Sequence, residues 1–143
     1  MLSKLLIAWS LTALCVIVHA IGMTTLLRWV SGWVKRVDVR FWFTTWMLVR
    51  AAGWIILLHL FEIAIWALFY ARGHGMPDLH SAFYFSAVTY TTTGYGDLVL
   101  PNEWRLVGGV EALTGILMCG WSAAFFFAVV TRMNEMRLKA ARS

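Results

Sequence analysis

Hydrophobic residues follow the chain in three long runs, and polar residues gather between and after them. The first run, residues 5–27, contains no charged residue, and the second (51–70) and third (106–131) contain one acidic residue each. Because a helix rises about 1.5 Å per residue, each run is long enough to cross the roughly 30 Å hydrocarbon core of a bilayer. The pattern therefore predicts an all-α membrane protein with three transmembrane helices.

A fourth apolar run, residues 79–90, is too short to span a membrane. It is preceded by Pro77 and Asp78, which suit a helix start because proline lacks a donor that the first turn cannot use and aspartate can cap the free N–H groups. The run therefore predicts a short helix that enters the membrane from one side and returns.

Charge separates the two sides of the predicted membrane. Hydrophobic residues make up 61% of the chain and charged residues 13%, with a formal net charge of +5. Basic residues outnumber acidic ones in the linker 28–50 and after Thr131, but not between residues 71 and 105. The positive-inside rule then predicts a cytoplasmic linker and C-terminus, with the N-terminus and the short helix outside. Residues 29–46 also mix basic and aromatic side chains, which predicts an amphipathic segment on the inner surface.

The N-terminus imitates a secretory signal peptide, since Lys4 precedes an apolar run that ends near Ala20. Cleavage there would reverse the predicted topology and leave the basic linker outside. We therefore expect residues 5–27 to be retained as a membrane helix. Cys15 and Cys119 both fall in apolar runs, so no disulfide framework is expected.

Residues 91–97 read Thr-Thr-Thr-Gly-Tyr-Gly-Asp, with Gly94 and Gly96 alternating with residues that carry a side chain. Glycine adopts positive φ without a Cβ penalty, so the alternation predicts an irregular backbone. Gly-Tyr-Gly alone is typical of a surface turn. The three threonines, Asp97 and the apolar runs on both sides instead favour a segment whose carbonyls replace the water around a dehydrated cation.

With this segment in that frame, residues 46–131 resemble the pore-loop potassium channels, in particular the small prokaryotic type. The resemblance implies a homotetramer, since one pore loop supplies only a quarter of the ion cage. It also implies a selectivity filter formed by Thr92, Thr93, Gly94, Tyr95 and Gly96, with K⁺ bound at the first four of these. Tyr95 is expected to point away from the axis as a spacer. Such a channel is expected to conduct K⁺ passively, and the short linkers between the predicted spans favour a bacterial inner membrane.

The resemblance divides the chain into three parts. Residues 1–45 hold the extra N-terminal helix and the basic interfacial linker, residues 46–131 form the pore module, and residues 132–143 form a short basic cytoplasmic tail. The first helix has no counterpart in a two-helix pore. It is expected to act as an insertion anchor or to hold a lipid or a partner subunit.

The chain departs from the family where the filter is braced. Related channels place a tryptophan or a glutamate behind the filter to hold the filter aspartate, and here these positions are Phe85 and Val88, so Asp97 lacks both usual partners. Thr93 replaces the usual valine or isoleucine, and its hydroxyl needs a hydrogen bond behind the filter. Three other side chains are candidates to hold Asp97: Tyr84, Tyr90 and Trp104.

The third run supplies the predicted cavity and gate. Gly115 and Gly120 stand where related channels place hinge glycines, although close helix packing explains them equally well. Helical spacing turns four residues toward the axis: Ile116, Cys119, Ala123 and Phe127. A ring of four Phe127 side chains would close the inner end of the pore by dewetting, unless Phe125 or Phe126 faces the axis instead.

Two carboxylates lie within the predicted spans, Glu62 and Glu111, with His59 one turn from Glu62. Antiparallel helices would place both carboxylates level with the filter. One hypothesis is a polar cluster that supports the filter by bracing the short helix and responds to pH. The alternative has Glu111 bonded to nearby backbone and Glu62 facing the outer headgroups. His59 and Glu62 alone provide too few ligands for a metal, and a core histidine is the simpler interpretation.

The leading hypothesis is thus a potassium-selective channel with K⁺ in its filter and no other cofactor. No catalytic constellation competes with it, so an enzyme is not expected. One alternative keeps the fold but loses strict selectivity. The other is a non-conducting membrane subunit that needs an unknown partner. Membrane lipids are expected partners; nucleic acid is not, because no soluble domain would hold it.

Overall fold

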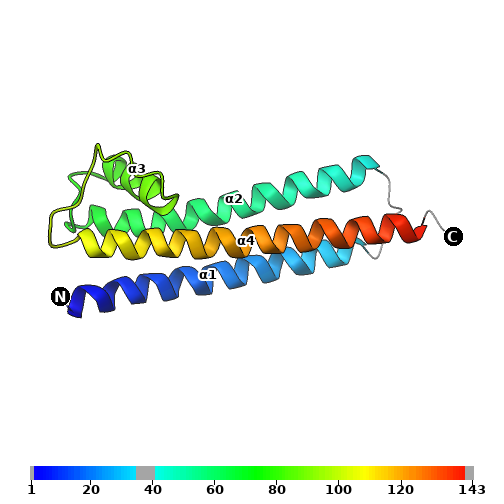
Figure 1. Cartoon of the computed structure of the whole chain (residues 1–143), viewed down its shortest axis with the longest axis horizontal. Helices are drawn as coiled ribbons and strands as arrows, with labels where there is room; N and C mark the ends of the chain where they lie inside the picture. Colours follow the sequence, from blue (N-terminus) through cyan, green and yellow to red (C-terminus); the bar gives the residue numbers. More distant parts are fainter. Residues whose placement is uncertain (1, 35–40, 141–143) are drawn as a thin grey trace.

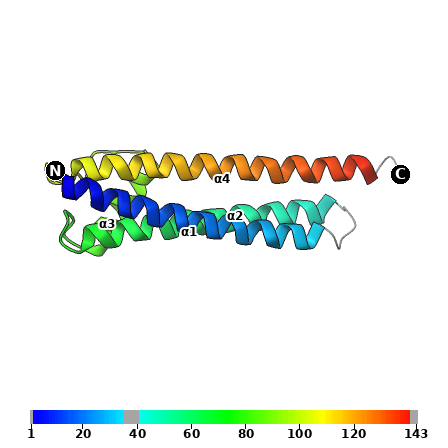
Figure 2. The same ribbon diagram turned by 90° about the horizontal axis from the view of Figure 1, so that it is seen from below.

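The computed structural model describes residues 2–34 and 41–140, all within or between four helices. These are α1 (Leu2–Val34), α2 (Phe41–Ala71), α3 (Leu79–Tyr90) and α4 (Arg105–Ala140). The three long helices run side by side, and the short α3 lies against one end of α2 and α4 (Figures 1 and 2). The N-terminus lies at the same end as α3, and the C-terminal end of α4 lies at the other (Figure 1).

The predicted all-helical architecture is confirmed. Three helices are long and apolar enough to cross a membrane, over Leu2–Gly32, Trp42–Ala71 and Arg105–Glu135. Each extends beyond the apolar run that predicted it, because arginine and lysine are good helix formers and no proline ends these segments. The predicted amphipathic segment at 29–46 does not form a separate helix in its described parts, which continue α1 and α2. Its middle, 35–40, lies outside the described residues.

The short helix has the predicted bounds, Leu79–Tyr90. Asp78 is its N-cap, with an extended backbone and a side chain that accepts a hydrogen bond from the Ser81 N–H at 2.8 Å. The Ser81 hydroxyl donates to the second carboxylate oxygen at 2.9 Å. These bonds lower the pKa of Asp78, the backbone bond most, because both favour the charged form.

Two apolar clusters hold the helices together. One surrounds α3 and includes Trp66, Tyr70, Tyr90 and Met118, and the other lies toward the opposite end of the bundle and includes Met133. Helix α1 contributes to both clusters and packs against both α2 and α4. Helix α3 is thereby fixed against α2 and α4, which determines where the loop that follows it begins.

Candidate functional site

The loop that follows α3 has a backbone of alternating handedness. Thr92, Gly94 and Gly96 have positive φ of 59°, 55° and 78°, whereas Thr93 and Tyr95 do not. The left-handed glycines agree with the expectation from the sequence. Thr92 was not anticipated, because a β-branched residue at positive φ is an outlier that something must hold in place.

The last turn of α3 holds this segment through its carbonyl groups. The Thr93 and Gly94 N–H groups donate to the Val88 carbonyl at 2.9 and 3.2 Å, and the Thr92 N–H donates to the Thr89 carbonyl at 2.9 Å. The free carbonyls of a helix end are thus satisfied by the loop. Residues 91–97 are all exposed, so in the single chain the other edge of the loop is open.

Thr93 has the hydrogen bond that its hydroxyl requires. The Thr91 hydroxyl donates to the Ala87 carbonyl at 2.7 Å, and the Thr91 and Thr93 hydroxyl oxygens are 3.0 Å apart. Since Thr91 uses its proton on Ala87, Thr93 donates to Thr91. A threonine in place of the family's apolar residue is therefore accommodated behind the loop.

Of the three candidates to hold Asp97, Tyr84 does so. Its hydroxyl donates to the Asp97 carboxylate at 2.6 Å, and this bond lowers the pKa of Asp97 because it favours the charged form. Tyr90 instead binds Glu62, and Trp104 lies under the Lys4 ammonium, 4.3 Å from the ring centroid. A cavity of about 200 Å³ lies between α3 and the loop, lined in part by Phe85 and Val88.

The two glycines of α4 that stand at the predicted hinge positions have different surroundings. A Cβ on Gly115 would overlap the backbone carbonyl of Tyr90, at the C-terminal end of α3, whereas a Cβ on Gly120 would meet nothing within 4 Å. Gly115 therefore permits close packing of α4 on α3, which is the packing interpretation. No packing contact explains Gly120.

The four residues predicted to face the axis lie on one exposed face of α4. Ile116 and Phe127 are 57% and 73% exposed, and Cys119 and Ala123 are also exposed. Phe125 and Phe126 are half-buried and pack against the apolar cluster that contains Met133. Phe127 is therefore the phenylalanine of the three that is free to face another chain.

Both intramembrane carboxylates are fully buried and bind side chains, so the alternative of backbone bonding for Glu111 and headgroup exposure for Glu62 is wrong. Glu111 accepts hydrogen bonds from the Tyr70 hydroxyl at 2.8 Å and the Ser86 hydroxyl at 2.5 Å. Since Ser86 lies on α3, Glu111 ties α2 and α4 to the short helix. Glu62 belongs to a separate group of side chains.

That group, the Glu62 cluster, consists of His19, His59, Glu62, Tyr90 and Ser122 and joins all four helices. His19 Nδ1 lies 2.8 Å from the Glu62 carboxylate, and the Tyr90 hydroxyl donates to the other carboxylate oxygen. His19 was missed in the sequence, although it is a lone polar ring in an otherwise apolar run. The imidazole and carboxylate atoms lie within 4.8 Å of one another, but each is engaged in hydrogen bonds within the cluster.

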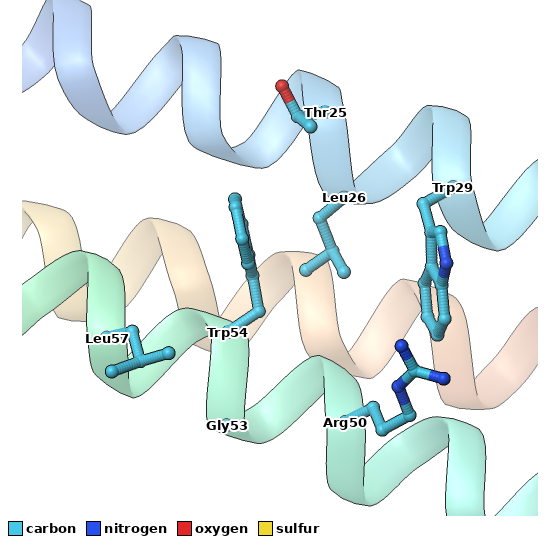
Figure 3. Close-up of a pocket in the computed structure, with 7 residues that line it drawn as sticks. All are labelled: Thr25, Leu26, Trp29, Arg50, Gly53, Trp54 and Leu57. Atoms are coloured by element: carbon cyan, nitrogen blue, oxygen red, sulfur yellow. The ribbon is translucent and has the colours of Figure 1, made fainter.

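A separate groove of about 470 Å³ lies between α1 and α2, away from α3 (Figure 3). The Arg50 guanidinium lies over the Trp29 ring, 4.8 Å from its centroid, and the Trp54 indole N–H donates to the Gly22 carbonyl at 3.1 Å. Arg50 thus reaches along the apolar surface to an aromatic partner. This groove contains none of the residues predicted to bind ions.

Comparison with known proteins supports the interpretation of the loop. The family model described as "Ion channel" matches residues 5–132. The chain is also 36% identical over 95 residues to the potassium voltage-gated channel protein Shal of Drosophila melanogaster. That match covers 62% of this chain but 17% of the relative, so the chain spans about a sixth of the relative's length. No solved structure matches.

Proposed function

Because the chain belongs to the ion channel family, and is therefore a channel and not an enzyme, we propose that it forms a homotetrameric, K⁺-selective channel. Four copies of residues 92–96 would surround one axis, with K⁺ held at Thr92, Thr93, Gly94 and Tyr95. A single chain exposes one edge of this segment and offers one loop, so the fourfold cage needs four copies.

The observation that carries the proposal is the alternating backbone of Thr92, Gly94 and Gly96. Because φ alternates in sign along the segment, successive carbonyls are able to turn toward the same side, and the N–H groups of Thr92, Thr93 and Gly94 already bind the end of α3. The printed name of the relative Shal, a potassium channel, supports K⁺ as the ion. The C-terminal end of α3 adds a partial negative charge that favours a cation nearby.

The remaining assignments follow from the same architecture. Residues 46–131 form the pore module, residues 1–45 an additional helix with its linker, and residues 132–143 the tail. The exposed face of α4 that ends at Phe127 lines the cavity, and Phe127 closes it. The linker 28–50 and the C-terminus are cytoplasmic and the N-terminus is external, in a bacterial inner membrane. Retention of α1 is favoured because its Thr12 and His19 bond to the other helices.

The test is K⁺ flux from liposomes that contain the purified protein, with Na⁺-loaded liposomes and barium block as ion controls. Gly94→Ala is the informative variant, since no atom lies within 4 Å of the added Cβ and the substitution changes only the cost of a positive φ. Gly109→Ala is its matched control, because that position is also open but lies in helix α4.

We expect barium-sensitive K⁺ flux without Na⁺ flux from the wild type and from Gly109→Ala. Gly94→Ala should assemble and lose most of the flux. Equal Na⁺ and K⁺ flux would indicate the weakly selective alternative. Absence of flux in either ion, across about pH 5 to about pH 8, would refute conduction by this chain alone and favour a subunit that requires a partner.

A further inference from the structure

The Glu62 cluster forms a closed ring of hydrogen bonds. Around the ring, Ser122 Oγ lies 3.2 Å from His19 Nε2, His19 Nδ1 lies 2.8 Å from Glu62, and Glu62 is bonded to the Tyr90 hydroxyl. The Tyr90 hydroxyl lies 3.1 Å from His59 Nδ1, and His59 Nε2 lies 3.1 Å from Ser122 Oγ, where the ring closes. Each of the five side chains takes part in two of these bonds.

Counting protons around this ring gives an unequal balance. Five hydrogen bonds need five protons, one for each. With Glu62 ionised and both imidazoles neutral, the hydroxyls of Ser122 and Tyr90 and the two imidazoles supply four. The fifth proton must come from solution and reside on Glu62 or on one of the two imidazoles. Without it, two lone pairs face each other in a buried site that carries an uncompensated negative charge.

We propose that the Glu62 cluster is a binding site for one proton, which ties α1 to the end of α3 and to α4. The site is closed except at His59: His19 and Glu62 are fully buried, Tyr90 and Ser122 are nearly so, and the His59 side chain is 16% exposed. His59, the least buried member, is therefore where a proton enters or leaves the ring. A second added proton would make both imidazoles cationic beside one carboxylate and leave a net positive charge in a buried site, so the ring is favoured over an intermediate range of pH.

Other titratable groups of the described residues lie near the ring. They include Cys15 on α1 and Cys119 on α4, which interact electrostatically with Glu62 and Tyr90. Glu111 on α4 and its partner Tyr70 on α2 form the neighbouring group. The Trp121 indole, which does not titrate, covers His19 with its ring centroid 5.2 Å away. Glu111 is bonded to Tyr70 and Ser86 and donates nothing to the ring.

Glu62→Gln tests the proton count directly. An amide oxygen can accept from His19 while the amide N–H donates to Tyr90, whose proton then passes to His59. The ring then holds five protons with none taken from solution. Glu111→Gln is the matched control. Glu111, on α4, is a buried carboxylate bonded to α3 as Glu62 is, but it lies outside the ring. Ser122→Ala is a second variant. It leaves the three bonds that join His19, Glu62, Tyr90 and His59, and the two neutral imidazoles and the Tyr90 hydroxyl supply the three protons these bonds need, so no proton from solution is required.

The measurement is the midpoint of thermal unfolding of the purified full-length protein from about pH 5 to about pH 9, with a chelator present to remove transition metals. The wild type and Glu111→Gln should lose about 4 °C toward the alkaline end, the change expected for one unpaired buried group in a chain of this size. Glu62→Gln and Ser122→Ala should lose this alkaline decline in melting temperature. Glu62→Gln should keep a decline at the acid end, where an added proton places a positive charge in the ring.

An alkaline decline that persists in Glu62→Gln, or one that disappears in Glu111→Gln, would overturn the proposal. If Glu62→Gln does not fold, Ser122→Ala decides alone, and persistence of the decline in that variant has the same meaning. The measurement needs no ion flux, so its result is independent of whether the chain conducts K⁺.

Discussion

Gly115→Ala should loosen the contact between α4 and α3. The added Cβ would overlap the Tyr90 carbonyl oxygen and come close to its carbonyl carbon and ring. These are mainly backbone atoms at the end of a helix, so no rotamer change removes the overlap. Either α4 moves outward or the end of α3 shifts, and the carbonyls of Val88 and Thr89 that hold the loop lie directly before that point.

The magnitude follows from two opposing contributions. Replacing glycine by alanine within a helix favours folding by about 1 kcal/mol, because alanine has the higher helix propensity. Overpacking against fixed atoms disfavours folding by about 1 to 3 kcal/mol, and backbone overlap places Gly115 at the upper end of that range. We therefore expect a net loss of about 2 kcal/mol. Gly120→Ala has the propensity gain without the overlap and should be neutral or stabilising by up to about 1 kcal/mol.

The assay compares the thermal stability of the assembled protein with flux from liposomes for both variants. Gly115→Ala should unfold several degrees below the wild type and conduct less, while Gly120→Ala should unfold at or above the wild-type temperature. Equal stability of Gly115→Ala and the wild type would refute the reasoning, since the close approach to Tyr90 would then have no energetic consequence. Reduced flux in a fully stable Gly120→Ala would indicate a hinge at that glycine.

Three further predictions concern the loop and α3. Tyr84→Phe removes the hydrogen-bond donor that lowers the pKa of Asp97. The bond to the ionised carboxylate stabilises the fold above the ordinary aspartate pKa, and this stability is lost as pH falls through the lowered pKa of Asp97. Wild-type flux should therefore decrease in acid, and the variant should show the decreased flux already at neutral pH. Thr93→Val removes the bond to Thr91 while keeping the shape, and K⁺ over Na⁺ selectivity measured by flux should persist. Asp78→Ala removes the N-cap and should reduce stability by about 1 kcal/mol in thermal unfolding, whereas Asp78→Asn should retain most of it.

The fold was accessible from the sequence because its determinants are local. The three long apolar runs predicted three spans, and the run 79–90 was too short to be a fourth. Pro77 and Asp78 indicated where the helix over that short run begins. The ends of the long helices could not be predicted from the sequence. Hydropathy decreases at the membrane surface, but basic residues continue a helix without difficulty, so α1 and α4 extend past the apolar runs.

The candidate site was predicted only in part, since several of its contacts depend on residues far apart in the chain. Positive φ was expected at Gly94 and Gly96 but not at Thr92. There the backbone is fixed by the Thr92 N–H bond to Thr89 and by the bonds of the next two N–H groups to the Val88 carbonyl. Glu62 and Glu111 were singled out as costly in a membrane. His19 was not, because its partners lie on α2 and α4 and no local pattern connects them.

His19 also bears on how the chain enters the membrane during synthesis. Helix α1 emerges first, before the ribosome has made α2 or α4, and its imidazole then has neither Glu62 nor Ser122 as a partner. An unpaired polar ring in hydrocarbon is unfavourable, so α1 should remain near the translocon or the membrane surface until α2 arrives. Insertion of the first helix would thus be completed by the second, and an isolated α1 segment should insert less well than its hydrophobicity suggests.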